Sequence, residues 1–183
     1  MILFMGVIGA GKSVQGKYLS DMLGYPWIST GEMLRQHISG EKRQRMLKGE
    51  LLTDDELFEI VEPVLLSHIK DGECKVILDG FPRTQVQAKW LQSFSEEQSV
   101  PIRCIIRLEA DQDVVIERLF ERGRPDDTSE VIKTRFKEYE RLTKPILNYF
   151  EQHGIPSPAI DGNGTEEEVR ERIANTINKI GIS

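Results

Sequence analysis

The first residues whose types and spacing could do chemistry lie near the N-terminus. Residues 6–13 read GVIGAGKS, which has the spacing G-x-x-x-x-G-K-[ST] of a phosphate-binding P-loop. The glycines let the backbone curl so that consecutive N–H groups point into one concavity, and a helix starting here adds the positive end of its dipole. Lys12 can then reach the outer phosphates of a nucleotide, and the Ser13 hydroxyl can bind Mg²⁺. A glycine-rich turn without a ligand is the alternative, which the apolar run before the octet and the helical pattern after it disfavour.

Asp79 is a second candidate, because it follows the apolar run 75–78 directly. An acidic residue at the end of a buried strand in a P-loop protein is placed to hold Mg²⁺, usually through a water. The same residue could equally be an ordinary loop or cap residue, and its position in the sequence does not separate the two readings.

A parallel sheet would position these residues. Apolar runs of strand length occur at residues 1–5, 27–28, 75–78, 102–108 and 158–160, and helical patterns lie between them. Strands alternating with helices indicate an α/β fold of three layers, here a P-loop NTPase fold with a central five-stranded parallel sheet. The right-handed crossover rule places the strand ends, and therefore the ligand, at one edge of that sheet.

The helix starts are predicted by capping boxes. We expect a first helix over residues 12–23, ended by Gly24. Its apolar side is predicted to hold Val14, Tyr18, Leu19, Met22 and Leu23. Later helices are predicted from four pairs of residues with capping-box spacing, which are Ser29 with Glu32, Thr53 with Glu56, Thr84 with Gln87, and Thr165 with Glu168.

The domain organisation is predicted to be simple. We expect residues 1–183 to form one domain. The charged helices of residues 30–70 are too long for a simple crossover, so we interpret them as an inserted flap. Residues 122–128 form a short polar break between two helices and are a second candidate flap.

Composition excludes several classes of protein. The chain is 39% hydrophobic and 30% charged, as in soluble globular proteins, and its net charge of −6 argues against general binding of nucleic acid. Cys74 and Cys104 are the only cysteines, so a disulfide framework and a four-sulfur zinc site are excluded, and buried thiols in a reducing cytoplasm are expected. No apolar run could span a membrane, the N-terminus does not resemble a signal peptide, and the histidines have no metal-binding spacing.

Blocks along almost the whole chain resemble the adenylate kinases, within the nucleoside monophosphate kinases. The matching blocks are GVIGAGKS at 6–13, ISTGEMLR at 28–35, LLTD at 51–54, DGFPRTQVQ at 79–87, ER at 117–118, and RGRPDD at 122–127 followed by Arg135. The resemblance implies Mg²⁺-dependent, reversible transfer of a phosphoryl group from ATP to AMP, giving two ADP, by a monomer. It also implies that residues 30–70 bind the nucleoside monophosphate and that residues 122–128 are a very short lid.

On the ATP side, the resemblance implies binding by the P-loop, by one helix and by the last loop. The implied residues are Gly9, Ala10, Gly11, Lys12, Ser13, Val14, Arg118, Arg122 and Gly164, with Ser13 and Asp79 on Mg²⁺. Arg118 would stack on the base and Arg122 would hold the phosphates. Because these arginines are four residues apart on a helix, a solvated surface paired with Glu117, Glu121, Asp126 and Asp127 remains an alternative. The DGNG segment around Gly164 could likewise be an ordinary turn.

On the AMP side, the resemblance implies a second set of residues. These are Thr30, Arg35, Leu51, Leu52, Gly80, Arg83, Gln87, Arg124 and Arg135. Arg35 and Arg83 would bind the AMP phosphate in bidentate fashion, and Gln87 would read the adenine edge unless it only closes the capping box. Lys12, Arg83, Arg122, Arg124 and Arg135 would surround the transferred group.

Two departures from the family pattern stand out. The family commonly has glycine and then threonine after the P-loop lysine, where this chain has Ser13 and Val14. In addition, Arg122-Gly123 runs directly into Arg124, so the lid would be very short and could hold no zinc. We expect poorer shielding from water and therefore some hydrolysis of ATP without AMP.

Three other functions compete with AMP phosphorylation. They are a UMP/CMP kinase on the same fold, a weakly catalytic nucleotide-binding module, and a small-metabolite kinase that shares only the P-loop. The resemblance implies a preference for AMP over pyrimidine nucleotides, because pyrimidine-directed relatives often have alanine and asparagine where this chain has Thr30 and Thr84. The full set of arginines argues against a mere binding module.

Overall fold

The computed structural model of the protein describes residues 1–48, 52–124 and 127–182. Its centre is a five-stranded sheet in the order β2-β5-β1-β6-β7, with every neighbouring pair parallel. The strands are β1 (Ile2–Gly6), β2 (Trp27–Ser29), β5 (Ile77–Asp79), β6 (Cys104–Glu109) and β7 (Ala159–Asp161). The predicted three-layer α/β fold and its five-stranded parallel sheet are therefore confirmed.

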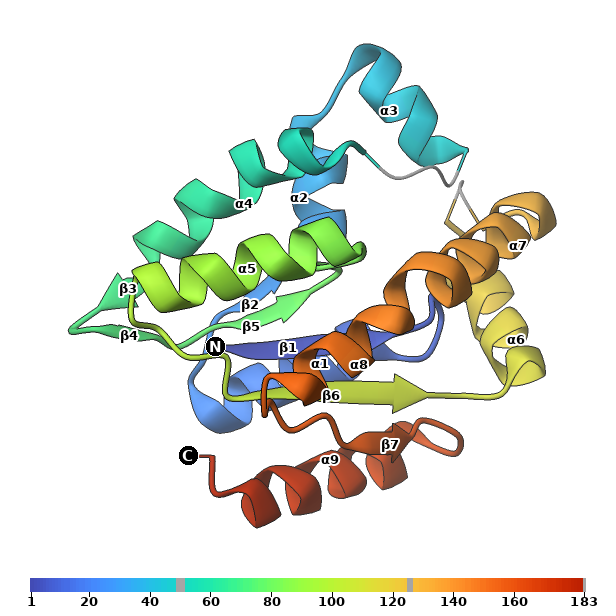
Figure 1. The fold of residues 1–183 in the computed structure, drawn as a ribbon. Coiled ribbons are helices and arrows are strands. Elements are labelled where there is room, and N and C mark those ends of the chain that lie inside the picture. Colours follow the sequence, from blue (N-terminus) through green and yellow to red (C-terminus); the bar gives the residue numbers. More distant parts are fainter. Residues whose placement is uncertain (49–51, 125–126, 183) are drawn as a thin grey trace.

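Helices cover both faces of the sheet (Figure 1). They are α1 (Lys12–Leu23), α2 (Thr30–His37), α3 (Gly40–Leu47), α4 (Asp54–Ser67), α5 (Gln85–Glu97), α6 (Gln112–Arg122), α7 (Ser129–Glu138), α8 (Pro145–Gln152) and α9 (Glu166–Ile180). A π-helical turn, η1 (Tyr139–Thr143), joins α7 to α8, and a short antiparallel pair, β3 (Ile69–Lys70) and β4 (Glu73–Cys74), follows α4. The sequence patterns indicated neither η1 nor this hairpin.

Alternating residues of β1 divide the core into two clusters. Leu3 and Met5 pack with apolar residues of α4, α5 and α8, whereas Ile2 and Phe4 pack with those of α1, α6 and α9. A strand buried on both faces must be apolar throughout, which explains why β1 reads as an unbroken hydrophobic run. The strand thus delivers the P-loop to the carboxyl edge of a fully covered sheet.

The apolar side predicted for α1 is confirmed at Leu19 and Leu23, which pack in the core, and wrong at Val14 and Met22. Val14 is 44% exposed and Met22 is 37% exposed, while Gln15, Gly16 and Leu19 are buried. The helix turns a small residue inward because the Trp27 ring lies directly against Gly16, where a Cβ would come within 1.8 Å of it. Predicted and observed bounds of α1 are the same, and Gly24 ends it in the left-handed conformation.

The capping boxes are confirmed at Thr53 and Thr165 and wrong at Ser29 and Thr84. At Thr53 and Thr165 both reciprocal hydrogen bonds are present. The Ser29 hydroxyl makes no cap and instead donates to Asp79 Oδ2 at 3.1 Å. Thr84 does accept from the Gln87 backbone N–H, but the Gln87 side chain bonds elsewhere. In both failures a polar side chain hydrogen-bonds to a residue far away in the sequence, Ser29 to Asp79 and Gln87 to Asp54.

Gly16→Ala should destabilise the fold. The new methyl group must displace the Trp27 ring, which itself packs edge-on against Phe4 at 5.6 Å between ring centroids. Overpacking of this kind costs about 1–3 kcal/mol and outweighs the helix propensity gained from alanine. Denaturant unfolding should report the loss in the free energy of unfolding.

Gly31→Ala is the matched control within α2. A Cβ at Gly31 would meet the flexible end of Arg35 at 3.4 Å and the Ser29 hydroxyl at 3.9 Å, which is ordinary van der Waals distance. We therefore expect this variant to be at least as stable as the parent chain. A Gly16→Ala protein as stable as the Gly31→Ala protein would contradict the packing argument.

Candidate active site

The P-loop connects β1 to α1 through two glycines in the left-handed conformation. Gly9 has φ 81°, and a Cβ there would lie 2.7 Å from Val115 and 2.8 Å from Leu119 of α6. Gly11 has φ 97° and caps α1. Ala10 is buried, and Ser13 and Val14 lie in the first turn of the helix. The loop is therefore held tightly on α6, with the start of α1 behind it, as an anion site requires.

Lys12 folds back over this loop. Its Nζ donates to the carbonyl oxygens of Gly6 at 2.9 Å and Val7 at 2.8 Å. Burial lowers the pKa of Lys12 to about 8; the carboxylate of Asp79 opposes this shift, and the charges of Arg83 and Arg122 add to it. A phosphate close to Lys12 would favour the protonated side chain.

Asp79 is the last residue of β5 and is buried between the neighbouring strands. Its Oδ2 accepts the Ser29 hydroxyl, while Oδ1 is buried with no hydrogen-bond partner among the described residues. An orphaned carboxylate oxygen beside a phosphate loop fits a Mg²⁺ ion with its water shell. The described residues contain no group of three or more His, Cys, Asp or Glu that could hold a metal, so phosphate oxygens and water would complete the coordination.

Arg83 lies on the loop that follows β5. Its Nε donates to the Gly80 carbonyl at 2.8 Å. Gly80 has φ 79°, and a Cβ there would come within 2.6 Å of Thr30 Oγ1 and 3.0 Å of Arg83 Nη2. Thr30 is buried and its hydroxyl donates to the Asp79 carbonyl. Glycine is thus required for the close approach of Thr30 and Arg83.

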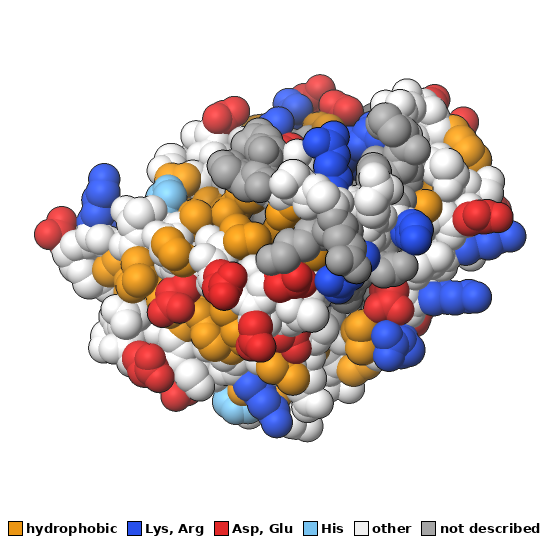
Figure 2. Space-filling model, turned by 90° about the horizontal axis from the view of Figure 1, so that it is seen from above, with side chains coloured by type: hydrophobic (Ala, Val, Ile, Leu, Met, Phe, Trp, Pro, Cys, Tyr) orange, Lys and Arg blue, Asp and Glu red, His pale blue; other side chains and the backbone are white. Residues whose placement is uncertain are grey.

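Positive charges converge around Arg83. Burial lowers the pKa of Arg83, the Asp79 carboxylate opposes that effect, and the charges of Arg135 and Arg35 lower the pKa further. These effects require the three guanidinium groups to lie near one another, although they come from α2, the loop after β5, and α7. Figure 2 shows the Lys and Arg side chains of this face mostly on its right half, toward the carboxyl ends of the strands. Such a concentration of charge in an acidic protein suits a polyanionic ligand.

Arg122 is held by Asp127. Its Nε and Nη2 donate to the two carboxylate oxygens of Asp127 at 2.9 and 2.6 Å, and the buried Asp127 also accepts from the Arg124 backbone N–H at 3.3 Å. The predicted partnership of Asp127 with an arginine is present in the structure. Residues 125–126 lie outside the described part of the chain, so Asp126 and the middle of the predicted lid are not described.

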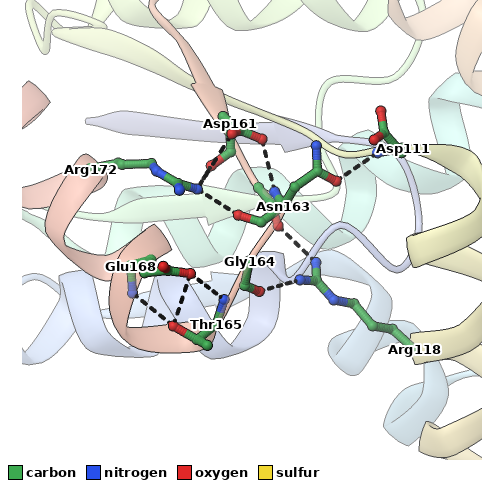
Figure 3. Close-up of polar contacts among 9 residues, drawn as sticks. Asp111, Arg118, Asp161, Asn163, Gly164, Thr165, Glu168 and Arg172 are labelled. Atoms are coloured by element: carbon green, nitrogen blue, oxygen red, sulfur yellow. Dashed lines mark hydrogen bonds and ion pairs between the residues drawn. The ribbon is translucent and has the colours of Figure 1, made fainter.

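Arg118 and the last loop are brought together, as Figure 3 shows. The Nη1 and Nη2 atoms of Arg118 donate to the carbonyl oxygens of Gly162 and Gly164, both at 2.9 Å. A Cβ at Gly162 would lie 3.3 Å from the Ala10 carbonyl of the P-loop. The two predicted contacts of the ATP base thus form one surface beside the phosphate loop.

The side-chain amide of Gln87, which was predicted to contact the adenine edge, is hydrogen-bonded to other protein groups. It is fully buried; its Oε1 accepts from the Arg83 backbone N–H at 2.7 Å, and its Nε2 donates to Asp54 Oδ1 at 2.7 Å. Leu52 is buried against the core, and Leu51 lies outside the described residues. Sequence reasoning missed Asp54 as a partner of Gln87, because its position at the start of α4 made it look like an ordinary helix-start residue.

Both cysteines are buried free thiols, as predicted. Burial raises the pKa of Cys104 to about 12, so this thiol is inert at neutral pH. Among the described residues, no helix combines the length and apolar character needed to cross a membrane.

Comparison with known proteins gives one consistent family. Residues 4–155 match the family model described as Adenylate kinase. An adenylate kinase of Prochlorococcus marinus is 36% identical over 182 residues, covering 96% of this chain and 97% of the relative. An adenylate kinase of Thermus thermophilus is 34% identical over 182 residues, covering 94% of each chain. The chain therefore belongs to the adenylate kinase family of nucleoside monophosphate kinases.

Proposed function

We propose that this protein catalyses the reversible, Mg²⁺-dependent transfer of a phosphoryl group from ATP to AMP, giving two ADP. The observation that carries the proposal is that the P-loop with Lys12 and the loop from Asp79 to Arg83 follow two paired strands, β1 and β5, at one sheet edge. The charges of Arg35 and Arg135 act on Arg83 there. The names of the relatives agree with it. We also propose that the protein works as a cytoplasmic monomer.

We assign the two nucleotides to the two sides of Asp79. The P-loop from Gly9 to Val14, with Arg118, Arg122 and Gly164, would bind ATP. Thr30, Arg35, Leu52, Gly80 and Arg83 would bind AMP, with Leu51 and Gln87 beside its base. Residues 30–70 would then be the flap over AMP, and residues 122–128 a very short lid over ATP.

Catalysis in this assignment is positioning and charge neutralisation. The AMP phosphate is already an ionised nucleophile, so no general base is needed. Lys12 and the guanidinium groups of Arg83, Arg122, Arg124 and Arg135 would neutralise charge on the transferred group. Mg²⁺ near Ser13 and Asp79, when bound, supplies further neutralisation of the phosphate oxygens.

The first test is a coupled assay of ADP formation from MgATP with AMP, CMP, UMP, GMP or no acceptor. We expect rapid ADP formation with AMP alone, and a slow but measurable hydrolysis without acceptor because the lid is short. Equal rates with and without every acceptor would indicate an ATPase or a binding module instead. Hydrolysis indistinguishable from buffer would contradict the expected effect of the lid.

Arg83→Ala and Arg124→Ala should each lower turnover with AMP by at least ~100-fold. Each variant removes a guanidinium that would neutralise negative charge on the transferred phosphoryl group. The matched control is Arg103→Ala at the opposite edge of the sheet, where the exposed guanidinium only approaches the Tyr25 hydroxyl at 3.4 Å. Steady-state kinetics of the three variants provide the comparison. Near wild-type turnover for either of the first two variants would remove its assigned role.

ATP affinity should weaken above pH 8. The free protein loses the Lys12 proton near its lowered pKa of about 8, whereas bound phosphates raise that pKa, so binding above pH 8 must take up a proton. We expect the Kd for MgATP to rise up to ~10-fold per pH unit above pH 8. Calorimetric titrations between pH 7 and pH 9.5 would measure it.

Lys12→Arg is the control for this pH dependence. Arginine keeps its charge throughout the range, so its Kd should stay flat even if its affinity is lower. A flat profile for the parent chain, or equal slopes for the two proteins, would show that another group is responsible.

A further inference from the structure

The backbone of Arg83 is held on both sides by side chains, one from Gln87 on the next helix and one from Thr143, 60 residues away. Its N–H donates to Gln87 Oε1 at 2.7 Å, and its carbonyl oxygen accepts from Thr143 Oγ1 at 3.1 Å. The Nε atom donates to the Gly80 carbonyl. Both the peptide groups and the inner end of the guanidinium are therefore fixed, while the Nη atoms make no hydrogen bond to another described residue. The side chain is oriented before any ligand arrives.

Gln87 is itself fixed, so the contact on the N–H side is rigid. Its Nε2 donates to Asp54 Oδ1, which also accepts the Thr84 hydroxyl at 2.9 Å. Asp54 is the first residue of α4. The N–H side of Arg83 is thus connected to the segment that we propose as the flap over AMP.

Thr143 connects the carbonyl side of Arg83 to a different element. It is buried and is the last residue of η1, whose backbone closes with a hydrogen bond from Lys144 N–H to the Tyr139 carbonyl at 2.8 Å. Pro145 explains the π-turn, because proline cannot donate to the preceding helical turn and its ring would clash there. Turns of this kind are frequent at functional sites.

The same continuous helical segment carries Arg135 and Thr143. α7, which holds Arg135, passes directly into η1. Arg135 lies close enough to Arg83 for its charge to affect the neighbouring guanidinium. The hydrogen bond from Thr143 therefore ties the backbone of one cationic residue to the helix that carries another.

We propose that Thr143 is a positioning residue that sets the place of Arg83 relative to Arg135. This inference rests on the proposed function, in which both arginines surround the transferred phosphoryl group. Small misplacements of such groups are costly, since about 1 Å can cost ~100-fold in rate. Thr143 itself touches no substrate in this assignment and acts only through the Arg83 peptide.

The test compares Thr143→Val, which keeps the shape and removes the hydroxyl, with Thr143→Ser, which keeps the hydroxyl. We expect Thr143→Val to lower kcat with AMP about 10-fold without changing the KM for ATP, because among the described residues the Thr143 hydroxyl bonds to Arg83 and not to the P-loop. Thr143→Ser should restore most of the loss. Thr176→Val is the control, since its hydroxyl donates only within α9, to the Arg172 carbonyl at 2.8 Å.

A double mutant separates positioning from general stability. If Thr143 acts through Arg83, Thr143→Val should lower kcat less than about 2-fold in an Arg83→Ala background, because the group it positions is already gone. Equal losses in both backgrounds, wild-type kcat for Thr143→Val, or no rescue by serine would each overturn the inference. Thr143→Ala replaces the valine variant in both backgrounds if the valine variant fails to fold.

The parent chain distinguishes the two levels of the proposal. An active parent chain with an unaffected Thr143→Val variant contradicts the positioning role alone. A parent chain that makes no ADP from MgATP and AMP contradicts the proposed function, and with it the role given to Thr143.

Discussion

The candidate site depends on the buried carboxylate of Asp79, whose charge acts both on Lys12 of the P-loop and on Arg83 of the loop after β5. Strand pairing places it opposite Phe4 on one side and Ser29 on the other, so it is buried where the P-loop begins. It opposes the lowering of the pKa of both Lys12 and Arg83 by burial. Without this carboxylate, Lys12 and Arg83 would lose the negative charge that offsets the cost of burying them, and charges are expensive to bury unpaired.

Short-range patterns in the sequence predicted the parts of the fold that depend on neighbouring residues. The P-loop, the bounds of α1 and the capping boxes at Thr53 and Thr165 follow from local hydrogen bonding and glycine geometry. The predictions failed where distant groups compete. Ser29 donates to a carboxylate 50 residues away rather than capping its own helix, and the side chain of Gln87 reaches Asp54 rather than Thr84. Charged acceptors win such competitions because their hydrogen bonds are stronger.

Sequence motifs indicated the residues of the candidate site but not the residues that support them. Residue types alone indicate which groups can bind phosphate, since arginine forks and P-loop glycines carry that chemistry in themselves. The supports of Arg83 could not be predicted, because Thr143 reaches it across 60 residues through a π-turn. The burial of Gly16 on α1 could not be predicted either, because it depends on the position of the Trp27 ring. Tertiary packing, rather than periodicity, decides both.

The side chain of Arg118 loses its conformational entropy when the protein folds, not when a ligand binds. Its guanidinium is held by two backbone carbonyls of the loop after β7, which also lies against the P-loop. Restricting a long arginine side chain costs about 2 kcal/mol in rotamer freedom. Here that loss occurs during folding, before any nucleotide arrives. A planar ring that settles on this arginine would meet a surface already in place, so little of its binding energy would be spent on ordering the protein.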